Sequence, residues 1–139
     1  MLPPVTTLRR AHGPAVLAVR NIRGLTMDTV AARANISPGY LSKIERGLRR
    51  PEGTITARLA AALDVEVEIL TGQKPAIAVI RDALGIEPTV FARDVGLTPG
   101  RLDRIERGLD IPDHELRAVI ARRLGIAADV LNPDAVAAA

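Results

Sequence analysis

The side chains of this sequence that could do chemistry are mostly cationic. Of the 139 residues, 17 are arginine and two are lysine, against 16 acidic residues, so the formal net charge is +3. Exposed arginines favour bidentate contacts with phosphate groups or with guanine. The positive charge is concentrated in residues 1–73, which carry ten basic and six acidic residues, whereas residues 74–139 carry nine and ten. This distribution favours a polyanionic partner for the first half of the chain.

The composition argues against several other kinds of site. The chain has no cysteine, and therefore no disulfide framework, thiolate nucleophile or zinc finger. His12 and His114 are isolated, which does not suit a metal site, and no residues have the spacing of a catalytic constellation. We therefore expect no enzymatic activity and no metal site. No apolar run approaches 18 residues and the N-terminus lacks the pattern of a signal peptide, so the expected location is the cytoplasm, with no membrane association.

The chain repeats itself at an offset of 61 residues. The segment SPGYLSKIERGL at residues 37–48 returns as TPGRLDRIERGL at residues 98–109. The offset holds without a gap from Arg20 and its counterpart Arg81 onward. An internal repeat at a fixed period indicates two copies of one structural unit. One copy has about 55 residues, which is close to the lower limit for independent folding.

Each copy has the pattern of five helices. In the third helix of the first copy, Ser37 is the expected N-cap, Pro38 takes the first helical position and Gly47 ends the helix. A Gly-then-Pro boundary at residues 71–75 separates the copies. The expected helices span residues 15–23, 27–34, 38–46, 53–63 and 66–70 in the first copy, and residues 76–84, 88–95, 99–107, 113–124 and 127–131 in the second.

We therefore expect an all-α chain of two tandem five-helix domains, joined by a short linker. The first domain is predicted over residues 14–72 and the second over residues 73–134. An N-terminal arm over residues 1–13 precedes them, and a tail over residues 135–139 follows.

The second and third helices of each copy have the spacing of a helix-turn-helix. A three-residue turn joins them and begins with Asn35 or Gly96, two residue types that suit the left-handed conformation. Ala31 is small where the helices must approach closely, and Leu41 and Ile44 anchor the third helix; the second copy has the same residue types at these positions. In this arrangement the later helix can lie in the major groove of DNA.

The segment TMDTVAARANISPGYLSKIERG at residues 26–47 resembles the XRE-type, phage-repressor-like helix-turn-helix family. The resemblance is close over residues 15–71 and looser over residues 76–132. It implies two tandem lambda-repressor-like domains, double-stranded DNA as the partner, and a transcriptional repressor of bacterial or phage origin, located at the nucleoid, that needs no cofactor. Because the copies differ on their third helices, they would read two non-identical half-sites in the major groove.

The expected DNA contacts lie on and just after the third helix of each copy. Lys43 is on the face opposite Leu41 and Ile44, where its ammonium can donate to guanine or to a phosphate. Tyr40 suits either a DNA contact or packing against the second helix. The expected DNA-binding residues are Tyr40, Ser42, Lys43, Arg46, Arg49 and Arg50 in the first copy, and Arg101, Arg104 and Arg107 in the second.

Two Arg and Glu pairs recur at the same offset and have a different expected role. Arg20 and Glu45 in the first copy correspond to Arg81 and Glu106 in the second. In the resembled family, an Arg and a Glu at these places form an ion pair inside the domain. We therefore assign these four residues to the structure and not to DNA contact.

A second hypothesis gives the chain another class of function. Asp103 and Asp110 reduce the positive charge of the second copy on its expected DNA face. The chain would then be a protein-interaction module, antitoxin-like or anti-activator, in which only the first domain, or neither, binds DNA. The second copy would bind another protein or a second copy of the chain as a homodimer. The leading hypothesis remains a sequence-specific DNA-binding regulator.

Overall fold

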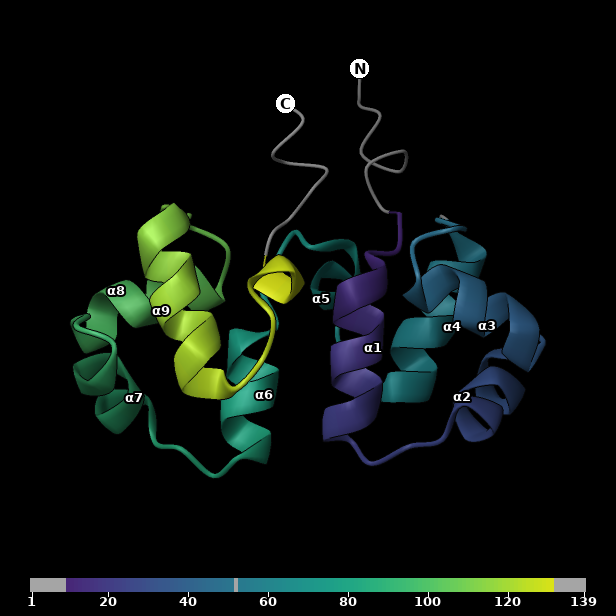
Figure 1. Cartoon of the computed structure of the whole chain (residues 1–139), viewed down its shortest axis with the longest axis horizontal. Coiled ribbons are helices and arrows are strands. Elements are labelled where there is room, and N and C mark those ends of the chain that lie inside the picture. The colour runs from purple at the N-terminus through teal and green to yellow at the C-terminus, as the bar shows by residue number, and fades with distance from the viewer. Residues whose placement is uncertain (1–9, 52, 132–139) are drawn as a thin grey trace, which may run out of the picture.

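The structure is a computed structural model that describes residues 10–51 and 53–131, and over these residues it is all-α (Figure 1). The first half contains α1 (Gly13–Ile22), α2 (Met27–Ala34), α3 (Pro38–Glu45), α4 (Thr54–Leu63) and α5 (Val67–Thr71). The second half contains α6 (Ile77–Ala83), α7 (Pro88–Asp94), α8 (Pro99–Glu106), α9 (His114–Leu124) and the 3₁₀ helix η2 (Ala128–Leu131). Every described helix is too short or too polar to span a bilayer.

The helices lie where the sequence predicts them, with differences at the two ends. The first helix begins at Gly13, two residues earlier than expected, because Pro14 supplies a helical φ in its first turn. Ala11 and His12, which precede the helix, are buried, and their backbone N–H groups donate to the carbonyl oxygens of Pro51 and Leu70, respectively. The last expected helix is a 3₁₀ helix. The rest of the expected arm, residues 1–9, and the expected tail lie outside the described residues.

The turn between α2 and α3 has the local chemistry that the sequence predicts. Asn35 adopts a left-handed conformation, with φ 59° and ψ 47°. The hydroxyl of Ser37 then accepts a hydrogen bond of 3.0 Å from the backbone N–H of Tyr40, which satisfies one of the unpaired donors at the start of α3. At the other end, Gly47 has a φ of +79° and stops the helix. These groups fix where α3 begins and ends.

The core of each half is built mainly from aliphatic side chains, to which α7 adds the buried ring of Phe91 in the second half. Leu41 and Ile44 of α3 are completely buried, as is Ala31 of α2, which lets the two helices pack closely. Leu102 and Ile105 take the equivalent places on α8, and each is at most 1% exposed. Both helices therefore direct one face into the core and leave the other available.

The two halves contact each other through the centre of the molecule. In Figure 1, α1 and α6 lie side by side at the centre, while α2 and α3 lie at one outer end and α7 and α8 at the other. Helix α1 also packs against η2. The ring nitrogen Nε2 of His12, at the start of α1, lies 2.8 Å from the carbonyl oxygen of Asp129 in η2. In this arrangement α3 and α8 lie on opposite sides of the central helices α1 and α6 (Figure 1).

Candidate nucleic-acid interface

The C-terminal end of α3 is held against the start of α1. A Cβ atom added to Gly13 would collide with the backbone carbonyl oxygens of Ile44 and Glu45, which shows how closely the two helices approach. Since backbone atoms cannot move as a flexible side chain can, only glycine fits this position without a shift of one helix. The close approach of α1 therefore positions the end of α3.

An ion pair joins the same two helices. Arg20 donates to Glu45 through Nε at 2.6 Å and through Nη2 at 3.0 Å, and its Nη1 donates to the carbonyl oxygen of Leu25 at 3.1 Å. The side chains are 13% and 4% exposed. The hydrogen bond with Glu45 raises the pKa of Arg20 above its ordinary value, against the opposing effect of burial. The pair is thus an internal tie between α1 and α3, and its charges do not face solvent.

The second half contains the same tie at the 61-residue offset. Arg81 donates to Glu106 through Nε at 2.9 Å and Nη2 at 3.3 Å, and its Nη1 donates to the carbonyl oxygen of Ile86 at 2.9 Å. Arg81 also lies 2.9 Å from the carboxylate of Asp82. The hydrogen bond with Glu106 is the main cause that raises the pKa of Arg81. All four residues of the two pairs, Arg20, Glu45, Arg81 and Glu106, therefore form ion pairs between packed helices.

The outer face of α3 and the loop after it carry unpaired positive charge. Lys43, Arg46 and Arg49 are exposed. None of them lies within ion-pair distance of a carboxylate in the described part of the chain. Each guanidinium group forms a hydrogen bond with the backbone: Arg46 Nε lies 3.4 Å from the carbonyl oxygen of Ser42, and Arg49 Nη1 lies 3.1 Å from that of Leu48. An anionic partner would meet no competing acid at these three residues.

The remaining predicted contacts of the first half are more enclosed. Tyr40 and Ser42 are half-buried, and Tyr40 packs against the core. Arg50 is also half-buried, and its Nε donates to the carbonyl oxygen of Ala11 at 3.1 Å. Arg50 therefore helps to hold the segment before α1, and its position differs from that of the three exposed cations.

The equivalent face of the second half is partly neutralised. Arg101 Nε lies 3.1 Å from Asp110 Oδ2, with side chains 48% and 25% exposed. Arg107 Nη1 lies 3.4 Å from Asp103 Oδ2, and both of these side chains are more than 60% exposed. Arg104 is exposed and has no carboxylate within ion-pair distance among the described residues. The structure thus pairs two of the three predicted arginines on and just after α8 with acids, and leaves Arg104 without one among the described residues.

Two residues that position this interface were not singled out by the sequence. His12 is 5% exposed and links the start of α1 to η2, and Gly13 admits the close approach to α3. The signal that could have found them is the Gly-Pro pair directly before the apolar helical run, which is typical of a helix start. No group of three or more His, Asp or Glu residues among the described positions could hold a metal ion.

Comparison with known proteins matches the first half of the chain. The helix-turn-helix family model matches residues 16–70. The HTH-type transcriptional regulator Rv0474 of Mycobacterium tuberculosis is 36% identical over 58 residues, which cover 42% of this chain and 41% of that protein. The HTH-type transcriptional regulator y4dJ of Sinorhizobium fredii is 40% identical over 65 residues, which cover 46% of this chain and 84% of that protein.

A phage protein is also similar. The immunity repressor protein of Bacillus phage phi105 is 34% identical over 65 residues, which cover 47% of this chain and 45% of the repressor. The matched segment therefore spans less than half the length of Rv0474 and of the phage repressor. No solved structure matches the chain.

Proposed function

Because the chain belongs to the helix-turn-helix family of transcriptional regulators, whose members bind DNA and are not enzymes, we propose that it is a repressor that binds a specific double-stranded DNA site. The observation that carries the proposal is the division of α3 into two faces. Leu41 and Ile44 are completely buried, whereas Lys43 and the following Arg46 and Arg49 are exposed without a carboxylate partner among the described residues. The name of the similar phage protein, an immunity repressor, supports repression as the direction of regulation.

The exposed face of α3 suits the major groove. The groove is wide enough to admit one α-helix, and a lysine at its floor can donate to O6 and N7 of guanine. Lys43 is the residue that we assign to this contact, with Ser42 beside it and Tyr40 at the first turn. Arg46 and Arg49 follow at the end of the helix, where we assign them to phosphates that fix the register of the protein on the duplex.

In this proposal the second half supplies a second helix, α8, that reads DNA as α3 does. Several features at the 61-residue offset support this part of the proposal: the Arg81–Glu106 tie, the hydrogen bond from the backbone N–H of Arg101 to the hydroxyl of Thr98, and the positive φ of Gly96. Helix α8 would then enter the adjacent half-site with Arg104 as its unpaired cation. Because α8 carries Arg101, Asp103 and Arg104 where α3 carries Tyr40, Ser42 and Lys43, the two half-sites would differ in sequence.

A second function for residues 73–134 is favoured by one observation. The ion pairs of Arg101 and Arg107 leave a surface of low net charge, and Leu109 and Ile111 beside it are 57% and 59% exposed. Exposed large apolar side chains among paired charges suit a protein partner better than a phosphate backbone. In this alternative the second half binds another protein and the first half alone binds DNA.

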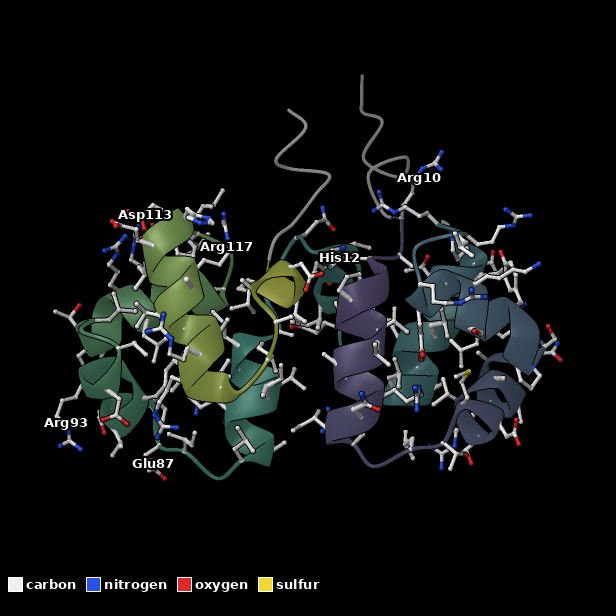
Figure 2. All side chains as sticks on the ribbon, in the orientation of Figure 1. Arg10, His12, Glu87, Arg93, Asp113 and Arg117 are labelled. Atoms are coloured by element: carbon white, nitrogen blue, oxygen red, sulfur yellow. The ribbon has the colours of Figure 1, made fainter. Side chains whose placement is uncertain are left out.

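The test is selection of duplexes from random DNA by the full chain, followed by fluorescence anisotropy with the selected duplex. We expect log affinity to fall linearly with log salt concentration, because bound cations displace counterions from the duplex. Lys43→Ala should weaken binding, whereas Arg93→Ala, which also removes one exposed positive charge, should leave it unchanged. Figure 2 shows Arg93 at the outer edge of the second half, far from α3. Failure to enrich any duplex would refute the proposal.

The same assay separates the two roles of the second half. If α8 reads a half-site, Arg104→Ala should weaken binding to the selected duplex, and base changes in one half of that duplex should no longer matter to the variant. If the second half binds protein instead, Arg104→Ala should bind every duplex as the wild-type chain does.

A further inference from the structure

We propose that Asp103 and Asp110 are specificity-determining residues that weaken the contact of α8 with DNA and so make α3 the dominant reader. The inference rests on the proposed DNA-binding function and assigns a role to two acidic residues on the face that would meet the phosphates. It concerns how affinity is divided between the two halves.

The starting observation is a difference between equivalent positions. At the 61-residue offset, Asp103 stands where the first half has Ser42, and Asp110 stands where it has Arg49. The exchange turns one neutral and one positive side chain into two negative ones. The exposed Lys43, Arg46 and Arg49 have no acid within ion-pair distance among the described residues, whereas two of the three arginines around α8 do.

The two ion pairs are unequal, and both oppose DNA binding. Asp110 is 25% exposed and lies 3.1 Å from Arg101 Nε, so this pair is partly shielded from water and holds the guanidinium in one place. Asp103 and Arg107 are separated by 3.4 Å and are largely exposed, so their mutual attraction is weak. Even so, a carboxylate on this face repels a phosphate whether or not its arginine stays paired.

The anchors of α8 do not include either acid. The helix is held by the buried side chains Leu102 and Ile105 and by the Arg81–Glu106 ion pair, and it is capped by Thr98. The hydrogen bonds of the two carboxylates are with Arg107 for Asp103 and with Arg101 for Asp110. Asp103 is largely exposed and Asp110 is half-buried, so thermal unfolding of each variant is measured before its DNA affinity is compared.

A weak second reader on the same chain still binds once the first has bound. After α3 has docked, α8 is confined near the adjacent half-site, and its effective concentration there is high. A second half of low intrinsic affinity would therefore increase the lifetime of the complex at a duplex with both half-sites, but it would not hold the chain at an isolated half-site. Asp103 and Asp110 would in this way raise discrimination between complete and incomplete operators.

The test exchanges residues between the halves of the full-length protein. The variant Asp103→Ser with Asp110→Arg gives α8 the residues of α3 at these positions, and Asp103→Asn with Asp110→Asn removes the charges alone. The reciprocal variant Ser42→Asp with Arg49→Asp places the acids around α3. Asp129→Arg in η2 is a control with the same charge change as Asp110→Arg, because Asp129 is exposed and contacts His12 through its backbone carbonyl oxygen, which the substitution keeps. Affinity for the selected duplex is measured by anisotropy at several salt concentrations, after thermal unfolding has shown that each variant is folded.

Each additional phosphate that is neutralised should raise affinity by about tenfold at about 0.1 M salt and steepen the salt slope by about one unit. We therefore expect Asp103→Ser with Asp110→Arg to bind at least tenfold more tightly than wild type, with a steeper slope, and the double asparagine variant to shift in the same direction. The reciprocal variant should lose affinity by at least the same factor.

The outcomes separate this inference from the proposed function. If wild type binds the duplex but the exchanged variants bind no more tightly, or if Asp129→Arg binds equally more tightly, the role of the two acids is refuted and the DNA-binding function stands. If wild type shows no salt-dependent binding to any duplex, the proposed function itself fails, and this inference fails with it.

Discussion

Replacement of Arg20 with alanine should unfold the first half at a lower temperature without acting on DNA directly. The change removes two charge-assisted hydrogen bonds to Glu45, at 2.6 and 3.0 Å, and one to the carbonyl oxygen of Leu25. It also leaves the carboxylate of Glu45, whose side chain is 4% exposed, without its cation. Breaking a buried pair by removing one partner costs about 3–5 kcal/mol. Because Arg20 keeps 13% exposure, we expect the lower end, about 3 kcal/mol.

The expected loss is large compared with the stability of a small domain. A change of 1 kcal/mol shifts the melting temperature by about 4–8 °C in a domain of 60–100 residues, so Arg20→Ala should lower it by about 12–24 °C. Circular dichroism at increasing temperature measures the shift. The double variant Arg20→Met with Glu45→Leu should recover much of the loss, because it removes both charges from the same site.

The equivalent change in the second half serves as the matched comparison. Arg81→Ala breaks a tie of the same geometry and should lower the stability of the second half by a similar amount. The reasoning is refuted if Arg20→Ala melts as wild type does but has lost its affinity for the selected duplex, because the arginine would then act at the DNA interface.

Three further predictions concern single positions. Gly13→Ala should destabilise the chain by about 1–3 kcal/mol, because its Cβ collides with backbone carbonyls at the end of α3; an unchanged melting temperature would contradict this. Lys43→Ala should lose about 1–3 kcal/mol of discrimination at one or two base pairs, measured with duplexes altered at each position, whereas an equal loss on all duplexes would assign Lys43 to a phosphate. Pairing with Glu45 and Glu106 raises the pKa of Arg20 and of Arg81. The stabilisation of the fold by these ion pairs is therefore fully present below the ordinary arginine pKa and is lost only as the pH rises through the raised pKa. The difference in melting temperature between wild type and Arg20→Ala should accordingly be the same at pH 7 and pH 9.

The local features of the fold could be predicted from the sequence because their causes are local. Ser37 caps α3 by accepting from the backbone N–H of Tyr40, three residues away, and Asn35 adopts its left-handed conformation within a single turn. The burial of Leu41 and Ile44 follows from their spacing on one helix. In each case the sequence neighbours determine the outcome, so a pattern of residue types was enough.

Features that depend on distant parts of the chain could not be predicted in the same way. The hydrogen bond from Arg50 Nε to the carbonyl oxygen of Ala11 joins residues 39 apart, and nothing in the sequence around Arg50 indicates it. The charge of Asp110 was evident, yet its pairing with Arg101 depends on how the loop after α8 folds back. The contact of His12 with Asp129 spans 117 residues and follows from the packing of the two halves.

For the proposed complex in which both halves read DNA, the contact between the halves constrains the geometry of the operator. Helix α1 packs against both α6 and η2, and His12 at the start of α1 contacts Asp129 in η2. The separation of α3 and α8 is therefore set by packed helices and not by the length of a flexible linker. B-form DNA completes a turn in about 10–10.5 base pairs, and a protein of fixed reader spacing requires its two half-sites on the same side of the duplex. About five base pairs inserted between them would turn the second half-site to the opposite side, and about ten would restore the helical phase at a longer distance. Operators of this protein should therefore tolerate base changes between the half-sites better than any change in their spacing.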